Sequence, residues 1–318
     1  MKLAFHTNAL GLWPIVRLAE WARGNGFDAL EVGPSIPLDE AGLRQAVKDT
    51  GIQIASLTYC RNVLDVDPAM AALHRQNVLD RVKLAGKLGV PLVVTSTGRA
   101  QNLSLEASLA PGIEFLGKEV LPLARECGVK IAIENCPAIG NVAVSPFMWR
   151  ELYRQLPELG LAYDPSHLVW QFIDPYLPLR EFGHKVMHVH AKDTQVLRDT
   201  LQDVGIEGQG WWRYRIPGWG EMNWTRIISD LRVRLRGGDL VRARRPGRGG
   251  RGGKSDTCPA PGPRFSAFHL GVQIEATHAS PTKEWHDDSY WHDWRRSDEQ
   301  CPRPLPGKNS KSPNRGSR

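Results

Sequence analysis

Several features typical of secreted, membrane-spanning or disulfide-stabilised proteins are missing from this chain of 318 residues. Its five cysteines are an odd number without a Cys-x-x-Cys pair, so we expect no disulfide framework. No apolar run approaches the roughly 18–20 residues that a membrane span needs. The stretch from Met1 to Asn8 is too short and polar for the hydrophobic part of a signal peptide. These absences favour a protein of the reducing cytoplasm that does not engage a membrane.

The formal net charge of +7 is unevenly distributed along the chain. Residues 1–231 hold 23 Lys/Arg and 25 Asp/Glu, a net charge of −2. Residues 232–318 hold 18 basic and 9 acidic residues, a net charge of +9. The basic character therefore comes from the C-terminal part alone. We predict two regions, a folded domain over 1–236 and a tail over 237–318.

Short apolar segments recur along the first region and predict β-strands. They are rich in Ile, Val, Leu and Ala, and several lack polar alternation, as is typical of strands covered on both faces of a sheet. The expected strands are Lys2–Thr7, Ala29–Val32, Gln53–Thr58, Pro91–Thr95, Lys130–Glu134, Gly160–Asp164 and Lys185–Ala191.

The segments between these strands are typical of helices. Apolar residues follow helical spacing from Ile15 to Ala22. Asp67-Pro68 and Ser145-Pro146 each combine an N-cap residue with proline at the first helical position. Helix ends are expected at three glycines that precede strands, Gly51, Gly89 and Gly128.

Seven such units predict an α/β protein of the (β/α)₈ TIM barrel class, with the eighth β-α unit degraded or missing. The competing layout is a doubly wound open sheet. Such a sheet usually carries a phosphate-binding Gly-x-Gly-x-x-Gly after its first strand, whereas this chain has the segment from His6 to Gly11 there. We therefore favour the barrel.

Ionisable side chains end three successive predicted strands. Glu134, Asp164 and His190 each close or follow a short apolar run. In an α/β barrel the carboxyl ends of all strands face one rim, where such enzymes carry their active site. A Glu/Asp/His set is a suitable ligand group for a divalent cation such as Mn²⁺, Mg²⁺, Co²⁺ or Zn²⁺. We predict that these three residues bind one divalent metal ion.

The regular alternation stops after Leu235. The run from Arg236 to Lys254 is rich in Arg and Gly, and the rest of the chain shows no periodicity, so composition predicts a mostly disordered tail over 237–318. Such a tail could bind single-stranded nucleic acid. We regard that function as the weaker interpretation, because only one short Arg/Gly run is present.

A shifted reading frame offers another explanation of the tail. If Arg242, Ala243, Arg244 and Arg245 are encoded CGA GCA CGA AGA, followed by the C that begins Pro246, a shift of one base yields Glu-His-Glu-Asp. The same shift turns the preceding residues into a turn and an apolar strand. Our hypothesis is that the tail is an out-of-frame version of the eighth unit of the barrel, whose strand would end in Glu.

Four motifs appear in order: Ile131-Ala-Ile-Glu134-Asn135, Tyr163-Asp164-Pro-Ser-His167, His188-Val-His190-Ala-Lys-Asp193 and Pro217-Gly218-Trp-Gly220-Glu-Met-Asn-Trp224. Because of these four motifs, residues 1–235 resemble the sugar phosphate isomerase/epimerase family, also called the xylose isomerase-like TIM barrel superfamily. The resemblance implies one divalent metal held by Glu134, Asp164, His190 and a strand-eight Glu, which is missing here. It also implies that His167 touches a substrate oxygen and that Glu134 is a catalytic acid/base.

Other polar residues are candidates for the substrate site. We include His188, Lys192 and Arg215, although packing behind the ligands is the plainer account of His188, and surface positions are open for the other two. The expected substrate is a small carbohydrate, which would be isomerised or epimerised through an enediolate. A polyol-ketone dehydratase is the alternative enzyme. A DNA-repair endonuclease is disfavoured because such an enzyme needs more metal ligands than this chain offers. The sequence leaves open whether the protein forms a homo-oligomer.

Overall fold

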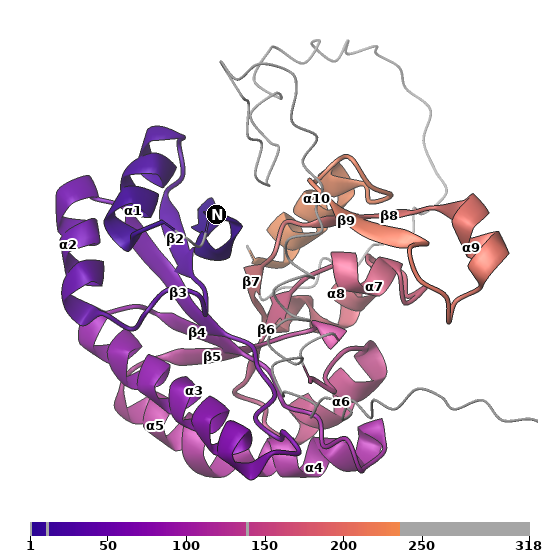
Figure 1. Ribbon diagram of the computed structural model, residues 1–318, viewed down its shortest axis with the longest axis horizontal. Coiled ribbons are helices and arrows are strands. Elements are labelled where there is room, and N and C mark those ends of the chain that lie inside the picture. The colour runs from indigo at the N-terminus through magenta and orange to yellow at the C-terminus, as the bar shows by residue number, and fades with distance from the viewer. Residues whose placement is uncertain (1, 11–12, 138–139, 236–318) are drawn as a thin grey trace, which may run out of the picture. The chain divides into compact units, whose positions relative to one another are not determined.

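The computed structural model describes residues 2–10, 13–137 and 140–235 (Figure 1). Seven parallel strands form one sheet in which each strand pairs with its sequence neighbours. The strands are β1 (Ala4–His6), β2 (Ala29–Val32), β3 (Gln53–Tyr59), β4 (Leu92–Thr95), β5 (Lys130–Glu134), β6 (Gly160–Tyr163) and β7 (Val186–Val189). The predicted strands are confirmed, and each of their bounds either agrees with the structure or differs by one or two residues.

Helices connect the strands and cover the outer face of the sheet; α1, α3 and α5 pack on the strands next to them (Figure 1). The helices are α1 (Ile15–Gly24), α2 (Glu40–Thr50), α3 (Pro68–Leu88), α4 (Leu105–Phe115), α5 (Leu121–Glu126), α6 (Pro146–Gln155), α7 (Ser166–Val169), α8 (Leu177–Phe182), α9 (Arg198–Val204) and α10 (Trp224–Leu235). Shorter helical turns are η1 (Thr7–Leu10), η2 (Leu116–Val120) and η4 (Gly183–Lys185).

The helix boundaries follow the expected local chemistry. The carboxylate of Asp67 accepts from the amide of Ala69 at 2.8 Å, and Pro68 begins α3. Gly51 and Gly89 end α2 and α3 with φ of 67°, a left-handed conformation that glycine adopts without steric cost. Helical crossovers return the chain between successive strands, so all seven strands of the sheet run parallel.

Successive side chains of a strand point to opposite faces of the sheet, so the apolar side chains form two separate clusters. Large side chains such as Ile131 and Ile133 point outward into the main core beneath the helices. The inner face carries a smaller cluster: Cys60, Leu92, Val94, Ala132 and Ala162. Because successive residues of a strand face opposite sides, the residues two positions beyond Ala132 and Ala162 lie on this inner face, at the carboxyl ends of β5 and β6.

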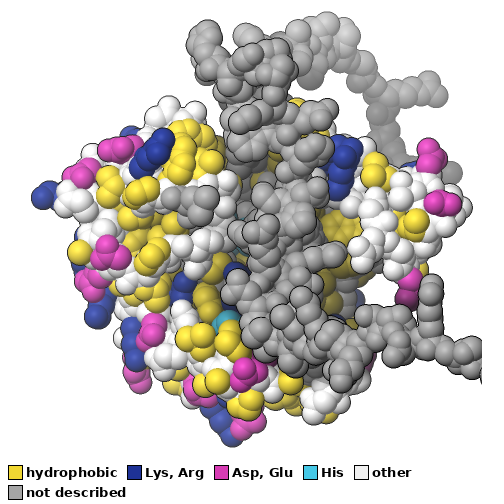
Figure 2. Space-filling view, in the orientation of Figure 1, with side chains coloured by type: hydrophobic (Ala, Val, Ile, Leu, Met, Phe, Trp, Pro, Cys, Tyr) yellow, Lys and Arg dark blue, Asp and Glu magenta, His cyan; other side chains and the backbone are white. Residues whose placement is uncertain are grey.

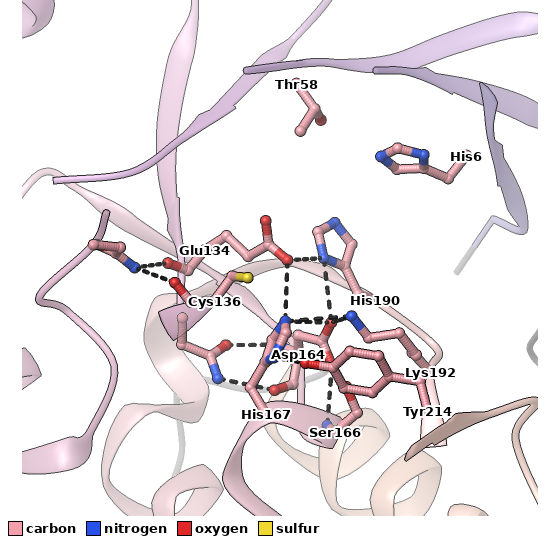
Figure 3. A network of polar contacts seen from close by, with 12 residues as sticks. His6, Thr58, Glu134, Cys136, Asp164, Ser166, His167, His190, Lys192 and Tyr214 are labelled. Carbon is pink, nitrogen blue, oxygen red and sulfur yellow. Dashed lines mark hydrogen bonds and ion pairs between the residues drawn. The ribbon is translucent and has the colours of Figure 1, made fainter. Parts of the chain in front are cut away.

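A feature that the sequence analysis missed is the antiparallel pair β8 (Asp193–Val196) and β9 (Trp212–Arg215). The buried carboxylate of Asp193 anchors this hairpin, because it accepts from the amide of Gly218 at 2.9 Å and from the indole N–H of Trp224 at 3.0 Å. The hairpin brings Tyr214 to the carboxyl ends of the parallel strands (Figure 3).

The fold is therefore α/β, with a seven-stranded parallel wall of the TIM barrel type, as predicted. The proposed eighth unit, the tail over 237–318 and the frame-shift hypothesis lie outside the described residues. Within the described ranges, no helix is long and apolar enough to cross a bilayer. Acidic and basic side chains are intermixed on the part of the surface that Figure 2 shows in colour.

Candidate metal centre

Strand pairing and one asparagine hold the carboxyl ends of β5 and β6 together. Asn135 follows β5 directly; its side chain donates to the carbonyl of Asp164 and accepts from the Asp164 amide, both at 2.8 Å. The amide of His190 donates to the carbonyl of Tyr163 at 2.9 Å, which extends the pairing of β7 with β6. These main-chain contacts bring Glu134, Asp164 and His190 to one point on the inner face (Figure 3).

The three predicted ligands lie within reach of one cation. His190 Nδ1 is 2.9 Å from Glu134 Oε1 and 3.8 Å from Asp164 Oδ2. One donor atom from each of the three residues lies within 4.8 Å of the others. Glu134 is 9% exposed and Asp164 is 1% exposed, so both carboxylates are nearly removed from water. The structure thus brings together the three residues that the sequence singled out.

The electrostatics of the group favour charged carboxylates. Burial raises the pKa of Glu134, but the charges of His190 and His167 outweigh it and hold that pKa well below its usual range. Burial lowers the pKa of His190, but Glu31 and Glu134 outweigh it and raise that pKa well above its usual range. A positive charge in the middle of this group is therefore strongly stabilised, whether a proton or a metal ion carries it.

One carboxylate oxygen provides a test of whether a metal ion fits. The amide and hydroxyl of Ser166 donate to Asp164 Oδ1, at 3.0 and 2.5 Å. Asp164 Oδ2 is buried and accepts no hydrogen bond, although Lys192 Nζ lies 3.0 Å away and forms an ion pair with it. A buried carboxylate oxygen without a hydrogen-bond donor needs a nearby cation, a task that the ammonium group of Lys192 performs here and that a divalent ion would share. Two carboxylates and an imidazole around that oxygen fit a divalent ion.

His167 and Lys192, two predicted substrate contacts, lie beside the metal group. His167 Nε2 is 3.3 Å from Asp164 Oδ2, 3.7 Å from Glu134 Oε1 and 3.3 Å from Lys192 Nζ. Burial lowers the pKa of Lys192, but Asp164 outweighs it and raises that pKa well above its usual range, so the side chain stays an ammonium group. The imidazole of His167 and the ammonium group of Lys192 are therefore two hydrogen-bonding groups next to each other and next to Asp164.

Tyr214 was not predicted from the sequence. Its hydroxyl lies 2.7 Å from His167 Nδ1, and the ammonium group of Lys192 lies 4.0 Å from the centre of its ring. Cys136, which follows β5 by two residues, also approaches Glu134 and His167 closely enough to share a cation with them. No local signal marks Tyr214, because its approach to the site depends on the hairpin.

A second group of polar residues lies on the other side of His190. Glu31, from β2, is 3% exposed, and its carboxylate contacts His188 Nε2 at 2.8 Å and His190 Nε2 at 3.0 Å. Burial raises the pKa of Glu31, but these histidines and His6 outweigh it and hold that pKa well below its usual range. His188 thus lies behind the predicted ligands. The only sequence signal for Glu31 was an acidic residue within an apolar strand.

Arg215, the remaining predicted substrate contact, lies on β9. Its Nε donates to Gln195 Oε1 at 2.9 Å, and Arg213 Nε donates to the same oxygen at 3.1 Å. Both arginines thus contribute to the pairing of β8 with β9. A role for Arg215 in substrate binding stays a prediction.

Comparisons with known proteins agree with this architecture. Residues 19–235 match the family described as xylose isomerase-like TIM barrel. The chain is 28% identical over 237 residues to the uncharacterized protein YfiH of Bacillus subtilis, covering 62% of this chain and 74% of that one. It is 24% identical over 229 residues to inosose dehydratase of Clostridium tetani, covering 65% and 74% of the two chains.

Solved structures share the fold. The 3-keto-D-glucoside 4-epimerase YcjR of E. coli superposes with a TM-score of 0.59 at 14% identity, covering 75% of this chain and 89% of that one. The IOLI protein, crystallised with a zinc atom, has a TM-score of 0.54 at 20% identity, covering 73% and 84%. Since the family match extends over more than half of its residues, the chain belongs to the xylose isomerase-like TIM barrel family.

Proposed function

We propose that this protein is a divalent-metal-dependent isomerase or epimerase of a sugar or sugar phosphate. The observation that carries the proposal is the meeting of Glu134, Asp164 and His190 around a buried carboxylate oxygen that accepts no hydrogen bond. The names of the structural neighbours, which include sugar epimerases, support a carbohydrate substrate. Glu134, Asp164 and His190 would hold the ion.

The reaction removes a proton from the carbon next to a carbonyl. A bound divalent ion would polarise that carbonyl and stabilise negative charge on its oxygen. Glu134 is kept ionised by His190 and His167, so it can accept the proton and return it to the neighbouring carbon of the enediolate. The ammonium group of Lys192 and the imidazole of His167, 3.3 Å apart beside the carboxylates, would donate hydrogen bonds to substrate oxygens.

The described residues suit isomerisation better than epimerisation. Moving a proton between adjacent carbons needs one carboxylate on one face of the planar intermediate, and Glu134 can supply it. Inverting a carbon needs a second base on the opposite face, and the expected strand-eight Glu would belong to a part of the chain outside the described residues. If residues 236–318 supply no such base, epimerisation should be slower than isomerisation.

A second candidate is dehydration of a polyol ketone. Curated relatives named inosose dehydratase align over 65% of this chain, and dehydration begins with the same proton abstraction next to a carbonyl. By contrast, nothing in the described residues favours the alternative of an impaired barrel that binds nucleic acid, since that function would depend on residues 237–318.

The test combines metal analysis with proton exchange. Purified full-length protein, loaded with Mn²⁺, is incubated in D₂O with ketoses such as D-fructose and D-psicose and with an inosose. We expect one bound ion per chain and incorporation of deuterium next to the carbonyl, detected by NMR. Formation of an aldose from a ketose would indicate an isomerase, and interconversion of D-fructose and D-psicose would indicate an epimerase. Loss of water from the inosose would indicate a dehydratase.

Glu134→Gln is the decisive variant because it removes one ligand and the proposed base with little change in shape. Its rate of deuterium incorporation should fall by a factor of about 10² or more, and it should bind Mn²⁺ more weakly. Glu20→Gln, an exposed position on α1, is the matched control and should behave as the unaltered protein. Equal metal binding and exchange in the Glu134 variant would refute the proposal.

A further inference from the structure

Glu31 lies at the meeting point of side chains from four strands. Its Oε1 accepts from the hydroxyl of Thr58 at 2.6 Å and lies 3.0 Å from His190 Nε2. Its Oε2 lies 2.8 Å from His188 Nε2, and His6 Nε2 lies 3.8 Å from Oε1. A buried carboxylate with donors on both oxygens is satisfied without any added cation. Asp164 Oδ2, in contrast, accepts no hydrogen bond and has the ammonium group of Lys192 at 3.0 Å as its ion-pair partner.

His190 connects this carboxylate with the metal group. Its two ring nitrogens face opposite ways: Nδ1 is 2.9 Å from Glu134 Oε1, and Nε2 is 3.0 Å from Glu31 Oε1. In Figure 3 the ring of His190 lies between two groups of side chains. Asp164 and His167 are on one side of it, and Thr58 and His6 are on the other. A neutral imidazole carries one N–H, so a ring that donates Nε2–H to Glu31 presents a lone pair on Nδ1 to Glu134 and Asp164.

We propose that Glu31 is a positioning residue for the metal ion: it accepts the Nε2–H of His190 and thereby fixes the ring with Nδ1 as the ligand atom. The inference rests on the proposed function, since it assigns Glu31 a task at that same metal site. A carboxylate that accepts the second N–H of a metal-binding histidine orients the ring and makes it more basic. His188 holds the other oxygen of Glu31 in place.

The alternative is a second cation among Glu31, His188 and His190, whose donor atoms also lie within 4.8 Å of one another. An ion there would use His190 Nε2, while the first ion uses Nδ1, so the imidazole would have to lose both of its protons. The hydrogen bonds already accepted by Glu31 make that arrangement less favourable. We therefore expect one ion, bound on the Asp164 side.

The experiment measures Mn²⁺ binding to full-length protein by calorimetric titration, with stoichiometry checked by electron paramagnetic resonance. Glu31→Gln and Glu31→Met should bind one ion about 10–100-fold more weakly than the unaltered protein. Glu20→Gln should bind normally. The melting temperature of each metal-free variant shows whether the barrel is intact. Affinity unchanged in both Glu31 variants would overturn the inference while leaving the proposed function standing.

Two further outcomes separate the hypotheses. Two ions per unaltered chain, falling to one in the Glu31 variants, would establish a second cation site and reject the positioning role. If the unaltered chain binds no ion, the proposed function fails and the inference fails with it. Should the variants not fold, ¹⁵N NMR of the histidine rings in the zinc-loaded unaltered protein decides: we expect the proton of His190 on Nε2, and a proton on Nδ1 would reject the proposal.

Discussion

The centre of the parallel sheet and its two outer strands differ in burial. Every residue of β4 and β6 is buried, whereas β1 and β7 each contain a single buried residue. The central strands pair on both sides and are covered by helices, but β1 and β7 are the ends of the seven-strand order. Within residues 2–10, 13–137 and 140–235, burial thus decreases toward β1 and β7, the two strands that an eighth strand would have to join to close a barrel.

The candidate metal centre lies across these two regions. Glu134 and Asp164 belong to the ends of the well-packed strands β5 and β6, whereas His190 follows the less buried β7. Glu31 contacts His188 and His190 and so links β2 to β7 through side chains. We infer that the carboxylates are held by the sheet, and that the position of the histidine depends on this polar link.

The largest change should come from restoring the eighth unit. Under the frame-shift hypothesis, DNA encoding residues 232–254 contains, in a frame shifted by one base, a turn and an apolar strand that ends in Glu. A chain translated in that frame should bind Mn²⁺ at least about tenfold more tightly, because a fourth ligand, the third carboxylate, is added, and should melt at a higher temperature. Titration and thermal unfolding of both chains would measure this.

The DNA sequence provides the direct check. If no alternative frame encodes a strand ending in Glu, the hypothesis is wrong and the difference between central and outer strands is a native property of this protein. Loss of salt-sensitive RNA binding on deletion of residues 237–318 would then favour a native, nucleic-acid-binding tail instead.

Much of the fold and the grouping of Glu134, Asp164 and His190 were predictable from the sequence. The strands were apparent because apolar runs covered on both faces are continuous, and Glu134 and Asp164 were apparent because each stands where such a run stops. Glu31 was not apparent, because its contact with His188 joins residues 157 positions apart. A single acidic residue in a four-residue strand does not indicate which partner it meets.

The hairpin of β8 and β9 was missed for a similar reason. Its strands are short, polar residues such as Thr194 and Gln195 interrupt the apolar pattern, and α9 separates the two strands. Its stability depends on the buried carboxylate of Asp193 and on the distant amide of Gly218, which no local pattern reveals. Tyr214 could therefore not be assigned to the site before the tertiary structure was known.

A matched pair of valine substitutions tests the difference in packing. Val93 on β4 is fully buried, and Val189 on β7 packs against the same apolar core while partly exposed. Val93→Ala should lower the free energy of unfolding by roughly 2 kcal/mol, and Val189→Ala by less than about 1 kcal/mol, because both lose methyl groups but only the first leaves a closed cavity. Urea unfolding followed by circular dichroism measures both, and equal losses would contradict the comparison.

The smallest expected effect is a pH dependence of the free energy of unfolding, caused by a histidine on α3, a helix that packs on β3 and β4. His74 on α3 lies 2.8 Å from the hydroxyl of Tyr59, and burial, together with the charge of Arg61, lowers its pKa. The unfolded chain therefore binds the proton more readily, so stability present above about pH 6.5 is lost as the pH falls toward the folded-state value. Because the ring is only partly buried, we expect a loss under about 1 kcal/mol.

His74→Gln isolates this contribution. Urea midpoints at pH 5.5 and pH 8 should differ less in the variant than in the unaltered protein, since glutamine cannot take up the proton. Tyr59→Phe removes the hydrogen bond but leaves the ring in place, so it should keep most of the pH dependence. A pH dependence that His74→Gln leaves intact would mean that other groups cause it, and that helix packing on β3 is too loose to perturb a histidine.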